Sequence, residues 1–250
     1  MKRIVYITAL LLCVACNTEN APDCFQTEGS IVITRFDVPF FSRIRIEDDV
    51  SLVIRQGDIQ EVFVETGENL LNDVSVTVEN EVLVFRDSNR CNLLREYGVT
   101  QAVVTTPDLK EIRNASEFNV VGQGVLRFPN LKLTSNTEGA IEDARKNGDF
   151  TLTVQCEDLV VEANGFSTFY IDGFTERANL GFTDEIPRFE GANLMVNDLR
   201  ILQRSANVMI VNPQESIRGQ IRGTGDVISV NRPSVVEVEE FFTGRLIFQD

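Results

Sequence analysis

The 250-residue sequence predicts an all-β protein in which an N-terminal β region leads into a parallel, right-handed β-helix, or solenoid, of about seven coils. Three observations predict this fold class. Apolar residues recur at every second position, which is the period of half-buried strands. From residue 109 onward, one template of about 14 residues recurs seven times, and such a repeat is typical of stacked arrays. The returns between repeats are too short for crossover helices, so successive strands must stack directly on one another.

The first element is a targeting segment over residues 1–15. Its basic start and short apolar stretch are typical of a secretory signal, because a transmembrane helix needs roughly 20 apolar residues. The sequence before Cys16 resembles a bacterial lipobox, with Cys13 where an aliphatic residue is usual. We therefore expect a lipoprotein that is lipidated at Cys16. The alternative is an ordinary signal cleaved near Ala15 or Ala21.

Residues 16–27 are polar, and we expect them to form a tether between the lipid and the folded part. The chain has 38 acidic against 23 basic residues, a formal net charge of −15. Such a charge repels phosphate backbones and excludes nucleic acid as a partner. The expected partners are the membrane, through the N-terminal lipid anchor, and an unidentified glycan or protein ligand. The expected location is the cell envelope, anchored in the outer membrane and facing either the cell surface or the periplasm.

The cysteines support an exported protein. Cys24 and Cys91 both lie in polar, turn-like segments, and we expect them to pair because the envelope is oxidising. A bridge that closes so long a loop contributes about 4 kcal/mol in the entropic model. Cys156 lies in an apolar, strand-like segment and is predicted to be a buried free thiol.

Residues 28–106 form the N-terminal β region. Val, Ile and Phe alternate with polar residues in SRIRIEDDVSLVIRQ, EVFVETG, DVSVTVEN and EVLVFRD, and no segment shows a helical period over three turns. The sequence leaves open whether this region is a separate domain or the first coils of the solenoid. Residues 107–250 are predicted to form the solenoid itself.

The seven repeats share an apolar first residue, two short strands and a corner between them. They begin at Leu109, Leu131, Leu159, Ala178, Leu199, Ile217 and Val235. Asn114, Asn136 and Asn164 occupy one template position at the corner, which predicts a column of stacked, hydrogen-bonded amides. The alternative is that they are three unrelated turn residues.

Little in the sequence indicates catalysis. The chain contains no His, which excludes Ser-His-Asp and Cys-His chemistry and most zinc sites. We expect no cofactor and no metal. Asp226 with Arg218 and Arg222, or Asp184 with Glu185, could supply an acid and a base, but solvated strand faces are the favoured interpretation.

Three segments resemble a known family. They are FSRIRIEDDVSLVIRQGDIQEVFVETGENLLNDVSVTVENEVLVFRD, NRCNLLREY and IRGQIRGTGDVISVNRPSVVEVEEFFTGRLIF. Together they resemble the autotransporter adhesin head GIN domain family, including its lipoprotein members from Bacteroidetes, over residues 28–250. The resemblance implies a β-helical exported protein. The family's Ser-Gly-Ser-Gly corners are reduced here to Arg-Gly-Thr-Gly at residues 222–225, which removes the basis for carrying over a ligand surface.

The resulting prediction is a non-enzymatic envelope lipoprotein that binds or adheres through the exposed strand faces of the solenoid. A periplasmic envelope scaffold is the first alternative. A polysaccharide-active β-helix enzyme is the second.

Overall fold

The computed structural model describes residues 23–89, 91, 93, 95–138 and 144–249. The predicted signal segment, Cys16 and most of the predicted tether lie outside the described residues. The described chain is all-β apart from two short 3-10 helices, η1 (Asp23–Phe25) and η2 (Leu71–Asp73). No helix in these residues is long and apolar enough to cross a membrane.

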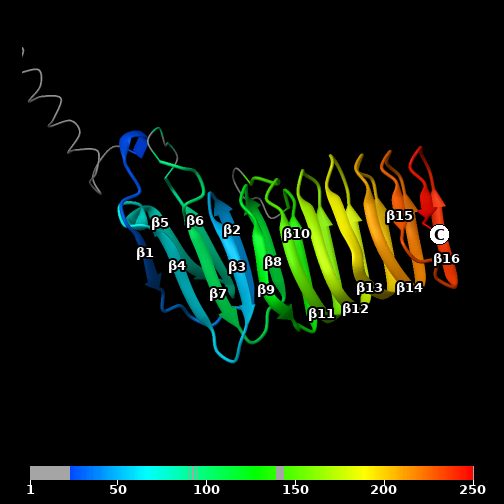
Figure 1. The fold of residues 1–250 in the computed structure, drawn as a ribbon, viewed down its shortest axis with the longest axis horizontal. Coiled ribbons are helices and arrows are strands. Elements are labelled where there is room, and N and C mark those ends of the chain that lie inside the picture. Colours follow the sequence, from blue (N-terminus) through cyan, green and yellow to red (C-terminus); the bar gives the residue numbers. More distant parts are fainter. Residues whose placement is uncertain (1–22, 90, 92, 94, 139–143, 250) are drawn as a thin grey trace, which may run out of the picture.

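The strands form one mixed sheet that is curled in its N-terminal part and continues as a long stack (Figure 1). The N-terminal strands are β1 (Ile31–Arg35), β2 (Arg43–Asp48), β3 (Ser51–Gln56), β4 (Glu61–Gly67), β5 (Val74–Glu79), β6 (Val82–Asp87) and β7 (Gln101–Thr106). The following strands are β8 (Glu111–Ser116), β9 (Val120–Leu126), β10 (Asn130–Ser135), β11 (Phe150–Ala163), β12 (Thr168–Phe182), β13 (Arg188–Gln203), β14 (Met209–Ile221), β15 (Val227–Ser229), β16 (Val235–Glu240) and β17 (Leu246–Phe248).

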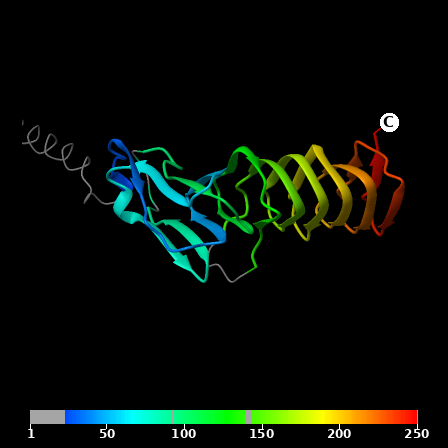
Figure 2. The ribbon, with the colours of Figure 1, turned by 90° about the horizontal axis from the view of Figure 1, so that it is seen from below.

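Hydrogen bonding arranges these strands in two ladders that run along the length of the molecule (Figure 2). The first ladder has the order β5–β6–β2–β8–β10–β11–β12–β13–β14–β16. The second has the order β1–β4–β7–β3–β9–β11–β12–β13–β14–β15–β17. Strands β11 to β14 are long and contribute their two halves to different ladders. Pairing is antiparallel only among the N-terminal strands and is parallel from β6 and β7 onward.

The register of the first ladder confirms five of the seven predicted repeat starts. They are successive Cα partners, in the order Leu131, Leu159, Ala178, Leu199 and Ile217. The first and last starts are each one residue early, because Lys132 pairs with Glu111 and Ile217 pairs with Val236. The last repeat opens with two adjacent valines, so the apolar pattern alone does not determine which of them takes the template position.

The N-terminal region continues both ladders. Strand β2 pairs with β6 on one side and with β8 on the other, and β3 lies in the same way between β7 and β9. Residues 43–56 therefore lie between segments that come later in the chain. The sequence suggests a boundary between residues 106 and 107, but the hydrogen-bonded ladders continue across it.

The core lies between the ladders and is built by alternation, with every second side chain pointing inward. Seven phenylalanines are among the largest fully buried side chains. Phe150 and Phe169 stack with ring centroids 4.7 Å apart, and Phe182 lies 5.9 Å from Phe169. At Gly219 the backbone has φ +136°, and a Cβ would lie 2.0 Å from the carbonyl oxygen of Ile201, so only glycine fits there.

Candidate functional site

The outer face of the first ladder carries the candidate site. On β11 the inward side chains Leu159 and Val161 are buried, whereas Asp158, Val160 and Glu162 point outward and are partly exposed. The same alternation continues on β12, β13 and β14. The outer face of these strands is therefore polar, while their inward side chains form part of the core.

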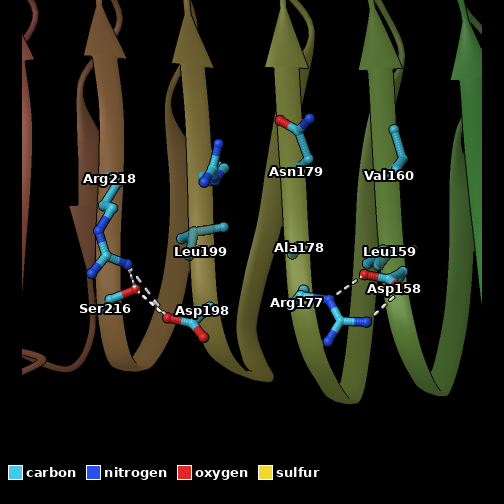
Figure 3. A pocket seen from close by; sticks show the side chains of 11 residues that line it. Asp158, Leu159, Val160, Arg177, Ala178, Asn179, Asp198, Leu199, Ser216 and Arg218 are labelled. Carbon is cyan, nitrogen blue, oxygen red and sulfur yellow. Dashed lines mark hydrogen bonds and ion pairs between the residues drawn. The ribbon is translucent and has the colours of Figure 1, made fainter.

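Three adjoining hollows lie on this face, and we call them together the groove. The first has a volume of about 420 Å³ and lies over β11 to β14 (Figure 3). The second has about 430 Å³ and the third about 230 Å³. All three share Asn179, the first two share Arg200 and Arg218, and the last two share Leu202. The shared walls make the groove one continuous depression along the ladder.

Ion pairs occupy one side of the first hollow, as Figure 3 shows. Arg177 donates two hydrogen bonds to Asp158, from Nε at 2.6 Å and from Nη2 at 2.7 Å. These hydrogen bonds lower the pKa of the Asp158 carboxyl below its ordinary value and raise the pKa of Arg177. Asp198 accepts a hydrogen bond from the Ser216 hydroxyl at 2.5 Å.

Arg218 is also paired. Its Nη1 lies 3.5 Å from Oδ1 of Asp198, and its Nε lies 3.1 Å from Oε2 of Glu237 on β16. The guanidinium groups of Arg177 and Arg218 are thus held by carboxylates of neighbouring strands. Their charges are largely neutralised before any ligand arrives.

Asn179 and Arg200 differ from these pairs. They are Cα partners on β12 and β13, and both are exposed in the groove. Neither side chain has a hydrogen-bond or ion-pair partner among the residues that the structure describes. The second hollow is lined by no carboxylate and by two arginines, of which only Arg200 keeps an uncompensated charge. A locally positive depression therefore lies on the surface of a protein with a net charge of −15.

The third hollow is deep because one of its lining residues is a glycine, which has no side chain to fill the space. Gly181 lies between Glu162 and Leu202 in one row of paired positions. A Cβ at Gly181 would meet nothing closer than the carbonyl oxygen of Val161, at 3.9 Å, so the space beside it is open. Asn164 also lines this hollow, and its buried Oδ1 has no hydrogen-bond donor in the described structure.

The asparagine column predicted from the sequence is wrong at Asn114, whereas Asn136 and Asn164 are in register with each other. Arg113 pairs with Thr134, which places Asn114 one position away from Asn136. Asn136 and Asn164 each come directly after the last Cα pair between β10 and β11, and both border the third hollow. Their hydrogen bonds also run elsewhere: Asn114 Nδ2 donates to Phe118 O, Asn136 Oδ1 accepts from Arg113 Nη1, and Asn164 Nδ2 donates to Thr137 Oγ1. The cause is the one-residue offset of the first repeat.

The cysteines lie as predicted. Cys24 and Cys91 form a disulfide with a Cα–Cα distance of 4.5 Å, and the Leu93 amide donates to the Cys24 carbonyl at 3.0 Å beside it. Cys156 is a buried free thiol on β11. Burial raises its pKa, and a side-chain hydrogen bond with Thr175 opposes this only in part.

The residues considered for catalysis have separate partners. Asp226 accepts a hydrogen bond from the Arg245 amide at 2.8 Å, whereas the Arg222 guanidinium lies 4.1 Å from the ring centroid of Phe241. Asp184 and Glu185 lie in the turn between β12 and β13, where Glu185 is 3.4 Å from Lys146. In the described part of the chain, no group of three or more His, Cys, Asp or Glu residues could hold a metal ion.

Sequence reasoning missed the pair Asn179 and Arg200. The signal was present, because both residues stand second in their repeats, directly after the repeat starts Ala178 and Leu199. Aligned repeats place such residues side by side on adjacent strands. The absence of partners for these two side chains could be recognised only once the neighbouring ion pairs were known.

The fold and the groove define an all-β protein with a long polar face on a stack of parallel strands. The profile of the family described as "Putative auto-transporter adhesin, head GIN domain" matches residues 40–233, so the chain belongs to this family. A search of curated proteins found no match.

Solved structures share the fold. A "putative adhesin" from Bacteroides fragilis is 17% identical, with 89% of this chain and 99% of that chain covered and a TM-score of 0.79. A "putative adhesin" from Parabacteroides merdae is 14% identical, with coverage of 89% and 97% and a TM-score of 0.63. A "Putative lipid binding protein" from Parabacteroides distasonis is 13% identical, with coverage of 89% and 98% and a TM-score of 0.59.

Proposed function

We propose that this protein is a non-enzymatic binding protein of the bacterial cell envelope that adheres to its target through the groove on the first ladder. The observation that carries the proposal is the pair Asn179 and Arg200, two polar side chains that have no partner within the described part of the chain and lie in a depression shared by four strands. Polar groups that converge in a hollow and lack partners are available to a ligand. The other arginines of the groove already have carboxylate partners.

The architecture supports this function. We interpret the stack as a parallel, right-handed β-helix whose coils are its successive repeats, with residues 28–106 as its N-terminal part. Arrays of this kind present long, regular faces on which a polymer can lie. The names of the similar structures, adhesins and one lipid-binding protein, agree with binding rather than turnover.

The charges of the groove favour a polar ligand over a lipid chain. Its outward side chains include the pairs Asp158–Arg177 and Asp198–Arg218, and an acyl chain laid over them would remove these charged groups from water without forming hydrogen bonds with them. A polar ligand can instead form hydrogen bonds with these groups.

Anchoring at the outer membrane through a lipidated Cys16 completes the proposal. It is supported by the apolar segment and the lipobox-like sequence that precede Cys16. Protease treatment of intact cells, followed by an immunoblot for residues 25–250, tests where the folded part lies. Loss of the signal is expected for a surface-exposed adhesin, whereas full protection would favour the periplasmic scaffold instead.

A bulky substitution tests the groove directly. Gly181→Trp fills the third hollow without a backbone clash, since the nearest atom to a Cβ there is 3.9 Å away. Thr151→Trp is the matched control, because Thr151 is exposed on the second ladder. Beads that carry the full chain are tested for adhesion to mucin, acidic and neutral polysaccharides, peptidoglycan and lipid vesicles.

Adhesion to at least one of these surfaces is expected for the wild type and for Thr151→Trp, and its loss is expected for Gly181→Trp. Equal adhesion by both variants would remove the groove as the binding surface. Product release from any of the polysaccharides would contradict the non-enzymatic assignment.

A further inference from the structure

We propose that Arg200 and Asn179 form a carboxylate site for an acidic polysaccharide in which acidic and neutral sugars alternate. This inference rests on the function proposed above and names the ligand class of the same groove. The distribution of charge along the groove favours one class of ligand, which the proposed binding function alone does not specify.

One basic group of the groove carries an uncompensated charge. The other two arginines of the groove, Arg177 and Arg218, are paired with carboxylates as described above, and Glu162 is paired with Lys132 of strand β10 at 2.7 Å. Arg200 lies beside Arg218 and has no carboxylate partner among the residues that the structure describes. An unpaired guanidinium offers two parallel N–H donors, and this geometry matches a carboxylate.

The neighbours of Arg200 on adjacent strands are polar or basic. Its Cα partners are Asn179 on β12 and Arg218 on β14, so the position is flanked by an amide and a second guanidinium. The Asn179 side chain offers both a donor and an acceptor, and neither forms a hydrogen bond with another described residue. Sugar hydroxyls, which donate and accept at the same oxygen, suit such a group.

Positive and negative groups alternate along the groove. Adjacent strands lie about 4.8 Å apart, so the five strands from β10 to β14 span about 20 Å. Carboxylates from Glu162, Asp158 and Asp198 line the groove around Arg200. A ligand with a carboxylate on every unit would bring like charges against them. A ligand with neutral hydroxyl-bearing units on either side of each carboxylate would avoid this repulsion.

The same spacing favours a saccharide over an acidic peptide. The backbone groups of this face are engaged in strand-to-strand hydrogen bonds, so a peptide could bind only through its side chains. The residues that line the groove include no aromatic group, and peptide interfaces depend strongly on aromatic anchors. Affinity for the saccharide should therefore come from charge and hydrogen bonds and should weaken as salt is added.

The test uses a hyaluronan octasaccharide, whose glucuronate and N-acetylglucosamine units alternate, titrated into the purified full chain by calorimetry at low salt. Arg200→Gln is the test variant. Arg204→Gln is the matched control, because Arg204 is an exposed arginine on the turn after β13, outside the groove and also without a side-chain partner in the described structure. The methyl-esterified octasaccharide removes the carboxylate charge from the ligand.

We expect the wild type and Arg204→Gln to bind alike, and Arg200→Gln to bind about tenfold more weakly or worse, since the variant loses a hydrogen bond between charged groups. The ester should bind the wild type about as weakly as the octasaccharide binds Arg200→Gln. Asn179→Ala should weaken binding by a smaller factor.

Several outcomes would overturn the inference. If Arg200→Gln and Arg204→Gln weakened octasaccharide binding equally, the effect would come from the overall charge and not from a site at Arg200. Undiminished binding of the ester would exclude a carboxylate site, and equally tight, Arg200-dependent binding of poly-glutamate would favour a peptide. Absence of hyaluronan binding would refute the ligand class, while the proposed function would still stand if Gly181→Trp alone abolished bead adhesion.

Discussion

Removing the disulfide should destabilise the N-terminal end of the stack by an amount that follows from the length of the loop. Cys24 and Cys91 are 67 residues apart in the sequence. In the entropic model, opening a loop of this length costs about 4.4 kcal/mol at 25 °C. We therefore expect the double variant Cys24→Ser/Cys91→Ser to lose unfolding free energy of this order.

The structure also indicates which part of the molecule should lose stability in this variant. The bridge joins η1 to the segment after β6, and beside it the buried Gln26 donates from Nε2 to the carbonyl oxygen of Asn69 at 2.7 Å. Strands β1 and β4 lie at this end, whereas β11 to β14 are remote from it. Because stacked arrays are stabilised mainly between neighbours, the N-terminal part should unfold at a lower denaturant concentration than the rest.

Urea denaturation followed by circular dichroism measures this loss, since the chain has no Trp to report by fluorescence. Cys156→Ser serves as the control for removing a thiol that forms no bridge. A transition midpoint that is unchanged in the double variant, or lowered equally in the control, would refute the reasoning from loop length.

Three further predictions concern the core, the free thiol and the groove. Phe169→Ala should cost about 3 to 5 kcal/mol, because the fully buried ring stacks on Phe150, and a loss below 1 kcal/mol in urea denaturation would show that the site collapses around the cavity. Cys156, whose pKa is raised by burial, should resist alkylation in the native protein at neutral pH and react only after unfolding, and rapid native-state labelling in mass spectrometry would contradict its burial. The hydrogen bonds from Arg177 lower the folded-state pKa of Asp158, so their contribution to stability is present above the unfolded-state pKa and is lost as pH falls through the lowered value. Carbon NMR titration should therefore show the Asp158 pKa rising in Arg177→Gln, and an unchanged pKa would contradict the assigned cause.

The alternation of apolar and polar residues predicted much of the fold, because it determines which side chains of a strand are buried and can be read from neighbouring residues in the sequence. Leu131, Leu159, Ala178, Leu199 and Ile217 are each followed by the same inward and outward order, so they align without knowledge of the structure. At Leu109 the alignment slips, because this buried residue precedes β8 and is not part of it. One slipped residue was enough to displace Asn114 from the predicted column.

The groove could not be predicted in the same way. The second residue of each repeat points outward, so the sequence places Asn179, Arg200 and Arg218 in one row. Whether an arginine in that row is free depends on carboxylates of other strands, such as Glu237 for Arg218. That pairing is set by side-chain geometry across the ladder, which repeat spacing does not encode.

The position of β2 and β3 between later segments has a consequence for the order in which the molecule can assemble. Each strand from β11 onward can add to a strand that has already been made, so this part of the stack can grow in the order of synthesis. Residues 43–56 gain partners on both sides only after residue 126 has been made, since β9 ends there. The N-terminal half must therefore close as one long-range unit, which is slow because of its loop entropy. Gene duplication can lengthen the C-terminal half one repeat at a time, but it cannot lengthen the interleaved half in this way.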